Sequence, residues 1–363
     1  MKRIFIFLLF LVGLLALDGC SEKEYAIYNS IEDTEDGIYN YCPSIYVEDG
    51  VYHVYYCSNK VNRNITDYIA YREGTRKNDV FSWSEKQLVM APTPRTWDER
   101  HTCDPSVIAG EFNYMGQKYN YLMAYLGCIT SNNQENSVGI AVASDPEGPW
   151  VKVDSINPIA EYKRNMDVDQ TIFQWGYGQP SLVSFDKAGV VLLFYTEGVP
   201  THTGTVVEKW DLKDLENPKL LDKAKVTNSG LADMNGKADF LNNADFGYDP
   251  VKKRLYAISD WHPWPQERDI PNNIVEAGRI SYIECGDKGL DILFDNDGVE
   301  WVTPFIIDEE KTGFPRNHNL GIVTDKYGWL PKSKSIEFAY SVSEKGHNAL
   351  WSYRIYFGEY FIR

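Results

Sequence analysis

The sequence predicts an all-β fold, a five-bladed β-propeller, from three observations. Its apolar runs are short, rich in Val, Ile, Tyr and Leu, and separated by turn signals such as Met115-Gly116 and Asp145-Pro146-Glu147-Gly148. No stretch shows a convincing helical period. One unit, an inner hairpin followed by two more strand-like runs, recurs five times at the spacing of four-stranded blades.

One small residue aligns the inner hairpins of the repeats. In chain order it is Ser44, Ser106, Ser181, Gly247 and Gly321. The further strands are expected over residues 68–72 and 83–90, 138–144 and 149–153, 206–212, and 279–284 and 301–307. The third repeat continues into a polar stretch with no clear fourth strand. Residues 25–28 are expected to complete the fifth sheet, because a closed ring leaves no exposed strand edge.

The N-terminus has the layout of a secretory signal over residues 1–19, and residues 20–363 are expected to form one domain without an internal linker. Basic residues precede an apolar run that is too short to span a membrane comfortably. A small residue followed by Cys20 resembles a bacterial lipoprotein cleavage site, so Cys20 is expected to carry a lipid. An ordinary cleaved signal is the alternative. The expected location is the periplasm or the outer-membrane surface, with membrane attachment only through this lipid.

Charge and composition restrict the classes of partner. A net charge of −16 disfavours nucleic acid and anionic membrane surfaces, which would need a basic patch. An aromatic content of 14% fits sugar-stacking surfaces, although a Tyr-rich all-β core would give the same content. Composition alone does not separate these two explanations.

A polar ring is predicted around the propeller axis. One end of each inner strand and the loop between the second and third strands open on the same face of a blade. Two positions before the shared small residue, the repeats carry Cys42, Asp104, Gln179, Asp245 and Asn319. These side chains are therefore expected to meet at one opening.

The centre of each hairpin predicts which residue stands across from this ring. In the first two repeats cysteines face cysteines: Cys42 with Cys57, and Cys103 with Cys128. Direct cross-strand neighbours are close enough to form a disulfide, and an exported protein permits one. Two disulfides and four reduced, buried thiols both remain open.

The same hairpin rule brings acids together. It places Glu197 opposite Gln179 and Asp260 opposite Asp245. With Asp104, these acids would share one mouth, where neighbouring carboxyl groups raise each other's pKa and divide into an acid and a base. Glycoside hydrolysis requires such a pair. Each acid taken singly also suits a turn carboxylate that binds backbone N–H groups, whereas the set favours a catalytic site.

Further candidates lie on the same predicted face. The repeat fixes His318 beside Asn319, and the loop Trp261-His262-Pro263-Trp264 offers two indoles for stacking on a sugar. His101 and His202 are candidates for the rim of the opening, although a histidine in such a loop is more often a solvated residue without a role. The substrate-binding candidates are His318, Trp261, His262, Gln179, Asn319 and Glu135.

The pattern resembles the five-bladed propeller glycosidases of glycoside hydrolase family 43 and its relatives, families 62, 117 and 130. The matching pieces are Asp104-Pro105-Ser106, the run ASDPEGPW at 143–150, the repeated hairpins and His318. Family 43 enzymes use an Asp at the first blade opening as base, an Asp at the third as pKa modulator and a Glu at the fourth as acid. This chain has Cys42, Gln179 and Asp245 there, so the family's triad does not carry over apart from an acid in blade four.

The resemblance implies a rearranged catalytic set if the protein is an enzyme. Asp104 is the expected base, Asp245 or Glu197 the acid, and Asp260 the neighbour that tunes Asp245. No cofactor is required. Some relatives hold a metal near an axial His similar in position to His318, which allows a structural calcium ion at the axis, but no ligand spacing in the sequence identifies an ion.

Three functional hypotheses follow. The first is an exported glycosidase that cleaves a poly- or oligosaccharide by carboxylate acid–base catalysis. The second is a glycan-binding propeller without catalysis. The third is a glycoside phosphorylase, which needs cations for phosphate and has only Arg100, Arg268 and Arg316 near the predicted face.

Overall fold

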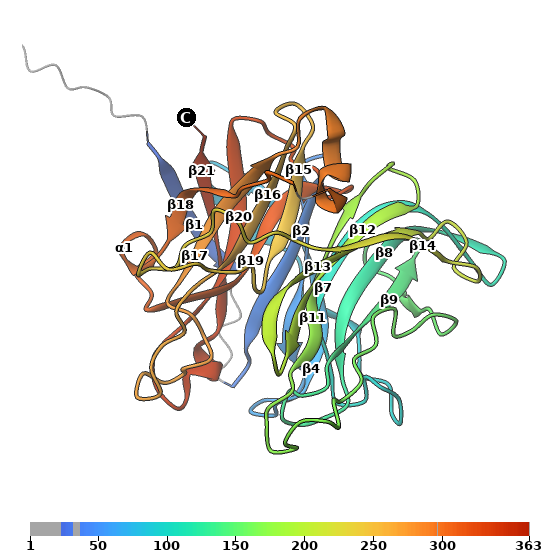
Figure 1. Ribbon diagram of the computed structural model, residues 1–363, viewed down its shortest axis with the longest axis horizontal. Coiled ribbons are helices and arrows are strands. Elements are labelled where there is room, and N and C mark those ends of the chain that lie inside the picture. Colours follow the sequence, from blue (N-terminus) through green and yellow to red (C-terminus); the bar gives the residue numbers. More distant parts are fainter. Residues whose placement is uncertain (1–22, 32–36, 296, 363) are drawn as a thin grey trace, which may run out of the picture.

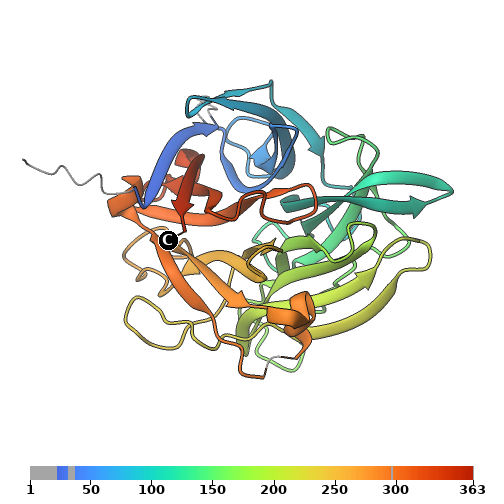
Figure 2. The same cartoon turned by 90° about the horizontal axis from the view of Figure 1, so that it is seen from above.

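Five blades surround a central axis, and each blade is a small antiparallel sheet (Figure 2). The computed structural model describes residues 23–31, 37–295 and 297–362. Strands make up nearly all the regular structure in this part of the chain (Figure 1). The predicted all-β, five-bladed propeller is confirmed.

The blades follow one another along the chain. The first contains β2 (Asn40–Glu48), β3 (Val51–Asn59), β4 (Asp67–Lys77) and two short outer strands, β5 (Val80–Trp83) and β6 (Gln87–Met90). The second contains β7 (His101–Tyr114), β8 (Gln117–Cys128), β9 (Ser137–Ala143) and β10 (Val151–Lys152). The third contains β11 (Gly176–Ser184), β12 (Val190–Val199), β13 (His202–Asp211) and β14 (Lys219–Lys225).

The last two blades complete the ring. The fourth contains β15 (Asp245–Asp249), β16 (Arg254–Trp261), β17 (Ala277–Glu284) and β18 (Val302–Ile307). The fifth contains β19 (Arg316–Asp325), β20 (Ser335–Ser343), β21 (Arg354–Phe361) and β1 (Tyr25–Ile31). The helical segments of the described chain are η1 (Gly286–Phe294), α1 (Glu309–Thr312) and η2 (Ala349–Ser352). Within the described ranges, no helix has the length and apolar character needed to cross a bilayer.

The two ends of the described chain close the ring. Strand β1 pairs antiparallel with β21, with Tyr25 opposite Tyr360, and Figure 2 shows this blue strand beside the red end of the chain. Residues 25–28 therefore complete the fifth sheet, as predicted. Near the axis, β19 also pairs in parallel with β2, so the fifth and first blades form one continuous path of strands.

The third repeat contains the fourth strand that its sequence did not clearly predict. This strand, β14, pairs with β13 at the outer edge of the blade. Six of its seven residues are exposed. A strand without a buried face needs no apolar alternation, which explains why the segment reads as a polar stretch.

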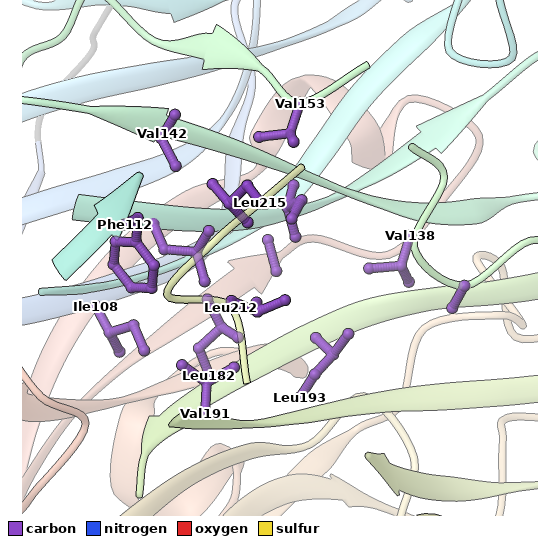
Figure 3. Close-up of a cluster of buried hydrophobic side chains, with 14 of the residues drawn as sticks. Ile108, Phe112, Val138, Val142, Val153, Leu182, Val191, Leu193, Leu212 and Leu215 are labelled. Carbon is purple, nitrogen blue, oxygen red and sulfur yellow. The ribbon is translucent and has the colours of Figure 1, made fainter. Parts of the chain in front are cut away.

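Hydrophobic side chains fill the spaces between neighbouring blades. Figure 3 shows the cluster between the second and third blades, where Ile108 and Phe112 of β7 lie near Leu182 of β11 and Val191 of β12. All four side chains are almost fully buried. Both faces of each blade contact a neighbouring blade. The central strands of a blade therefore carry apolar side chains on both faces, instead of alternating apolar and polar residues.

A chain of hydrogen bonds joins the inner strands close to the axis. In each case a backbone N–H donates to a side-chain oxygen of the preceding blade. The bonds run from Val107 to Ser44 Oγ (3.3 Å), Leu182 to Ser106 Oγ (2.9 Å), Phe246 to Ser181 Oγ (3.0 Å) and Ile322 to Asp245 Oδ2 (2.8 Å). They fix the position of each inner strand relative to the next one.

This pattern corrects the alignment of the fourth repeat by two residues. Asp245, not Gly247, occupies the position of the aligned serines, because the position supplies an oxygen acceptor. The polar ring position of this blade therefore belongs to Asn243. The backbone agrees, since φ is positive at Cys42 (55°), Asp104 (46°), Gln179 (51°), Asn243 (50°) and Asn319 (43°).

A buried ionic cluster stabilises the seam between the first and fifth blades. Arg76 of β4 lies 2.7 Å from Glu337 Oε1 and 3.5 Å from Glu359 Oε2, and both carboxylates are almost fully buried. Tyr28 of β1 donates to Glu359 (2.8 Å), and its ring centroid lies 4.5 Å from the guanidinium carbon. Lys332 is the other cation near these carboxylates, at 3.3 and 3.4 Å.

Arg76→Met is expected to lower the free energy of unfolding by roughly 3 kcal/mol, because two buried carboxylates then share only Lys332. Arg254→Met is the matched control. Arg254 pairs with the exposed Glu284 at 2.7 Å across β16 and β17, so its loss is expected to cost less than about 1 kcal/mol. Denaturant unfolding followed by tryptophan fluorescence measures both values, and equal losses would contradict the assignment of the seam.

Candidate functional site

A pocket of about 820 Å³ opens where the five blades approach the axis. Each blade places a polar residue in its wall. In blade order these are Asp67, Asp104, Gln179, Asp260 and Asn319. The structure thus brings together two of the four predicted catalytic acids, Asp104 and Asp260, with a third carboxylate, Asp67, that was not predicted.

Asp104 lies on the bulged part of β7 and is only 5% exposed. Its carboxylate accepts hydrogen bonds from the Cys42 thiol and from the backbone N–H of Gln179. Its own backbone N–H points at Cys57 Sγ, 2.9 Å away. Burial raises the pKa of Asp104 to about 6, and the negative charge of Asp67 acts in the same direction.

Asp260 lies near the end of β16 and is also 5% exposed. Its carboxylate accepts from Asn243 Nδ2, 3.4 Å from Oδ1, and from the backbone N–H of Asn319. Burial raises the pKa of Asp260 to about 7, although the positive charges of His262 and Arg279 oppose this rise.

Amide side chains connect these acids to the axial histidine. Asn319 Nδ2 donates to Asn243 Oδ1 (3.1 Å), and His318 Nδ1 bonds to Asn319 Oδ1. Burial lowers the pKa of His318 to about 4, so the ring is neutral near pH 7. With the proton on Nδ1, the lone pair of Nε2 has no partner among the described residues, and neither has Gln179 Oε1. Buried acceptors without partners suit the hydroxyl donors of a sugar.

A second group of polar side chains lies beside Asp104. Asp67 begins β4, and its carboxylate accepts from Tyr39 Oη (2.7 Å) and lies 2.8 Å from His101 Nδ1. Asp67, Tyr39 and His101 all line the pocket. The rim candidate His101 is thus in the site. Asp67 follows directly after the loop between the second and third strands of its blade, which is the positional signal that points to it.

Aromatic rings complete the wall. They are Tyr39, Tyr41, Phe173, Trp175, Trp264 and Tyr353. Trp175 packs against Gly178 and Gly198, where an added Cβ would lie 2.9 Å from the indole. Gly176 and Gly178 follow Trp175 at alternate positions, and this spacing is the sequence signal for the ring. Trp175 was not among the predicted residues.

Two predicted catalytic acids lie outside the pocket wall. On β12 the neighbours Thr196 and Gly198 face the pocket, so Glu197 points to the other side of the strand, 2.6 Å from His202 Nε2. Asp245 accepts from Ser181 Oγ (2.6 Å) and from the inner strand of the fifth blade. The expectation that Glu197 and Asp245 share the mouth is wrong, because strand alternation and the corrected alignment direct them elsewhere.

The predicted binding loops contribute in part. The indole N–H of Trp261 donates to the Ala232 carbonyl (2.9 Å), and only Trp264 of the two indoles lines the pocket. His262 is buried, with Nδ1 2.7 Å from Asp239. Glu135 pairs with Arg164 at 2.9 Å, outside the pocket wall.

The predicted cysteine pairs are wrong. The disulfide joins Cys57 to Cys103, with 5.1 Å between the Cα atoms, while Cys42 and Cys128 are free. Bulges shift both hairpins before the cysteines meet, so Tyr41 faces Cys57 and Leu126 faces Cys103. The bond therefore links the first blade to the second, directly behind Asp104.

The cluster of carboxyl and sulfur ligand atoms at the axis is not the oxygen set that calcium takes. Among the described residues, one group places three ligand atoms within 4.8 Å of one another: Cys42, Cys57 and Asp104. Calcium takes six to eight oxygen ligands, whereas this group offers one carboxylate, and Cys57 is bound in the disulfide. No step is therefore assigned to a metal.

The proposed phosphate-binding cations also lie elsewhere. Arg316 is buried against Glu276 at 2.6 Å, and neither Arg100 nor Arg268 belongs to the pocket wall. The described lining contains no Lys or Arg. Phosphorolysis therefore has no support from this site.

No family model and no curated protein matches the sequence. Solved structures with the same fold include a family 117 glycoside hydrolase of the marine bacterium Zobellia galactanivorans, with TM-score 0.58 and 14% identity over 93% of this chain and 89% of that chain. A family 62 hydrolase in complex with xylotriose has TM-score 0.56 and 10% identity, covering 93% and 97%. A thermostable family 43 glycoside hydrolase has TM-score 0.53 and 14% identity, covering 91% of each chain. The chain therefore has the fold of the propeller glycoside hydrolases.

Proposed function

We propose that the protein is a glycoside hydrolase with Asp104 and Asp260 as its acid–base pair. The observation that carries the proposal is the presence of these two buried carboxyl groups, from different blades, in the wall of one pocket. A buried carboxyl group that no lysine or arginine contacts is costly for stability, and such groups cluster at catalytic sites.

The two raised pKa values suit acid–base catalysis near neutral pH. Both values lie close to neutral pH, about 6 for Asp104 and about 7 for Asp260, so each group can take up and release a proton there. Asp260 is the acid that protonates the glycosidic oxygen, and Asp104 is the base that accepts a proton from the attacking water. The unpartnered acceptors His318 Nε2 and Gln179 Oε1 hold sugar hydroxyls.

A glycan-binding protein without catalysis is the second candidate. It is favoured by Cys42 and Gln179, which stand at openings where the resembled family 43 enzymes have catalytic carboxyl groups. The aromatic and amide side chains of the wall would serve binding alone equally well.

We further propose that the protein is exported and lipid-anchored through Cys20, which lies outside the described residues, with residues 20–363 as one domain. The Cys57–Cys103 disulfide supports export, because disulfides persist in oxidising compartments. Carbohydrate is then the partner, and the membrane is contacted only through the lipid.

Asp104→Asn and Asp260→Asn are each expected to lower kcat at least 100-fold on any glycoside that the native protein hydrolyses, because general acid–base groups contribute about 10²–10⁴ in rate. Glu197→Gln is the matched control, since Glu197 lies one residue from the wall but points away from it. A screen of aryl glycosides and oligosaccharides identifies a substrate of the native protein, and kcat on that substrate is then measured for the three variants. Binding without turnover by the native protein would favour the second candidate, and unchanged hydrolysis in both Asn variants would refute the roles.

The pH profile of kcat/KM is expected to be bell-shaped, with apparent pKa values near 6 and 7 that belong to the pair.

The free energy of unfolding also depends on pH through Asp260, in the opposite sense to an acid whose pKa is lowered by folding. Because the folded pKa of Asp260 lies above its ordinary value of 3.8, its stabilising effect is complete below about pH 4 and is lost as the pH rises through 7. Asp260→Asn is therefore expected to be more stable than the native protein at pH 8 by roughly 1–3 kcal/mol, and not at pH 4. Thermal unfolding at both pH values decides this.

Replacement of both Cys57 and Cys103 by Ala is expected to lower the free energy of unfolding by roughly 4 kcal/mol, because the bond closes a loop with a sequence separation of 46. It should also lower kcat at least tenfold, since the N–H of Asp104 loses its sulfur partner. Cys128→Ala is the control, as Cys128 is a buried thiol outside the disulfide. If kcat is kept in the double variant, the bond does not position Asp104.

A further inference from the structure

Apolar side chains gather at the mouth of the pocket, together with the exposed amides of Asn133, Asn272 and Asn273 and outside the polar floor. The apolar collar consists of Ile65, Phe173, Val199, Trp264, Ile274 and Leu350. Three of them are strongly exposed: Ile65 is 58%, Phe173 57% and Trp264 40% exposed. The floor residues Asp104, Asp260 and His318 are at most 5% exposed. The pocket therefore has two zones of different chemistry.

The collar is assembled from equivalent loops of different blades. The connections between the second and third strands supply Ile65 in the first blade, Trp264 and Ile274 in the fourth, and Leu350 in the fifth. Val199 is the last residue of β12, directly before this connection in the third blade. Phe173 comes from the segment before β11. A single exposed apolar residue needs no explanation, but six around one opening mark a binding surface.

The chemistry of the collar restricts what it binds. Four of its members are aliphatic, so they offer no hydrogen bond to a sugar hydroxyl and cannot stack on a sugar face as an aromatic ring does. The floor, in contrast, offers carboxyl groups, amides and an open imidazole nitrogen. A ligand that satisfies both zones has one polar glycosyl unit and an apolar group beside it. A volume of about 820 Å³ is in the range of pockets that hold such a ligand.

We propose that the site takes glycosides whose aglycone is an apolar alkyl or aryl group, with the sugar on the floor and the aglycone under the collar. This inference rests on the proposed function, because it places the bond to the aglycone beside Asp104 and Asp260. In the reaction, Asp260 gives its proton to the departing aglycone oxygen, while Asp104 takes a proton from the water that attacks the anomeric carbon. The products are the free sugar and the alcohol or phenol of the aglycone.

The test compares methyl and hexyl glycosides of one sugar, taken from those that the native protein binds or hydrolyses. The two leaving alcohols are similarly acidic, so a difference in KM or Kd reports contact with the alkyl chain. Each methylene that is fully buried improves binding about fourfold, and partial burial of five methylenes should favour the hexyl glycoside at least tenfold. Phe173→Ser with Ile65→Ser is expected to reduce this preference below threefold.

Ile172→Ser is the matched control. Ile172 neighbours Phe173 in the chain and is 42% exposed, yet it does not line the pocket, so the hexyl preference should remain. Equal binding of the two glycosides, or a preference for an oligosaccharide that the collar variants leave unchanged, would overturn the inference. If hexyl glycosides bind more tightly but none is hydrolysed, the proposed function fails and the collar assignment stands.

Discussion

The hydrogen bonds between successive inner strands are the interaction on which the pocket depends. Each one ties an inner strand to a side-chain oxygen of the preceding blade, as from Phe246 to Ser181. Two residues before the aligned position, as Gln179 is before Ser181, every blade has a residue other than glycine with a positive φ. Such backbone costs on the order of 1 kcal/mol or more at each site and persists only where the surroundings fix it. The bonded inner strands provide those surroundings, and Asp104 and Asn319 reach the axis as a result.

Blade number and ring closure were open to prediction because both follow from patterns that survive in one sequence. Short apolar runs and turn residues repeat with each blade, and an unpaired edge favours closure by the first strand. In the fourth repeat the alignment was wrong, because it used Gly247 at the position that Asp245 holds. Smallness was the visible common property of the aligned residues, whereas in the first four blades the property that the fold uses is an oxygen that accepts an N–H from the next blade.

The residues that face each other across a hairpin were harder to predict, because counting outward from the centre of the hairpin assumes that the two strands pair without a bulge. One extra residue in a bulge moves every later side chain by one position, which changes both its partner and its face. The bulge between Tyr41 and Ser44 takes Cys42 away from Cys57. Cys57 instead meets a cysteine of the next blade, a contact between blades that hairpin counting within one repeat does not address.

The raised pKa of Asp260 depends on how the nearest basic side chains are bound. Arg279 is fully buried 2.8 Å from Asp239, and the imidazole of His262 lies 2.7 Å from the same carboxylate. Asp239 therefore offsets both groups, while the direct partners of Asp260 are amides. An amide N–H stabilises an oxygen without adding a full charge, so burial still outweighs it. If Arg279 paired with Asp260 instead of Asp239, its charge would favour the ionised carboxylate, and Asp260 would lose the acid role proposed for it. From a position behind the wall, Asp239 thus helps to keep the pKa of Asp260 above its ordinary value.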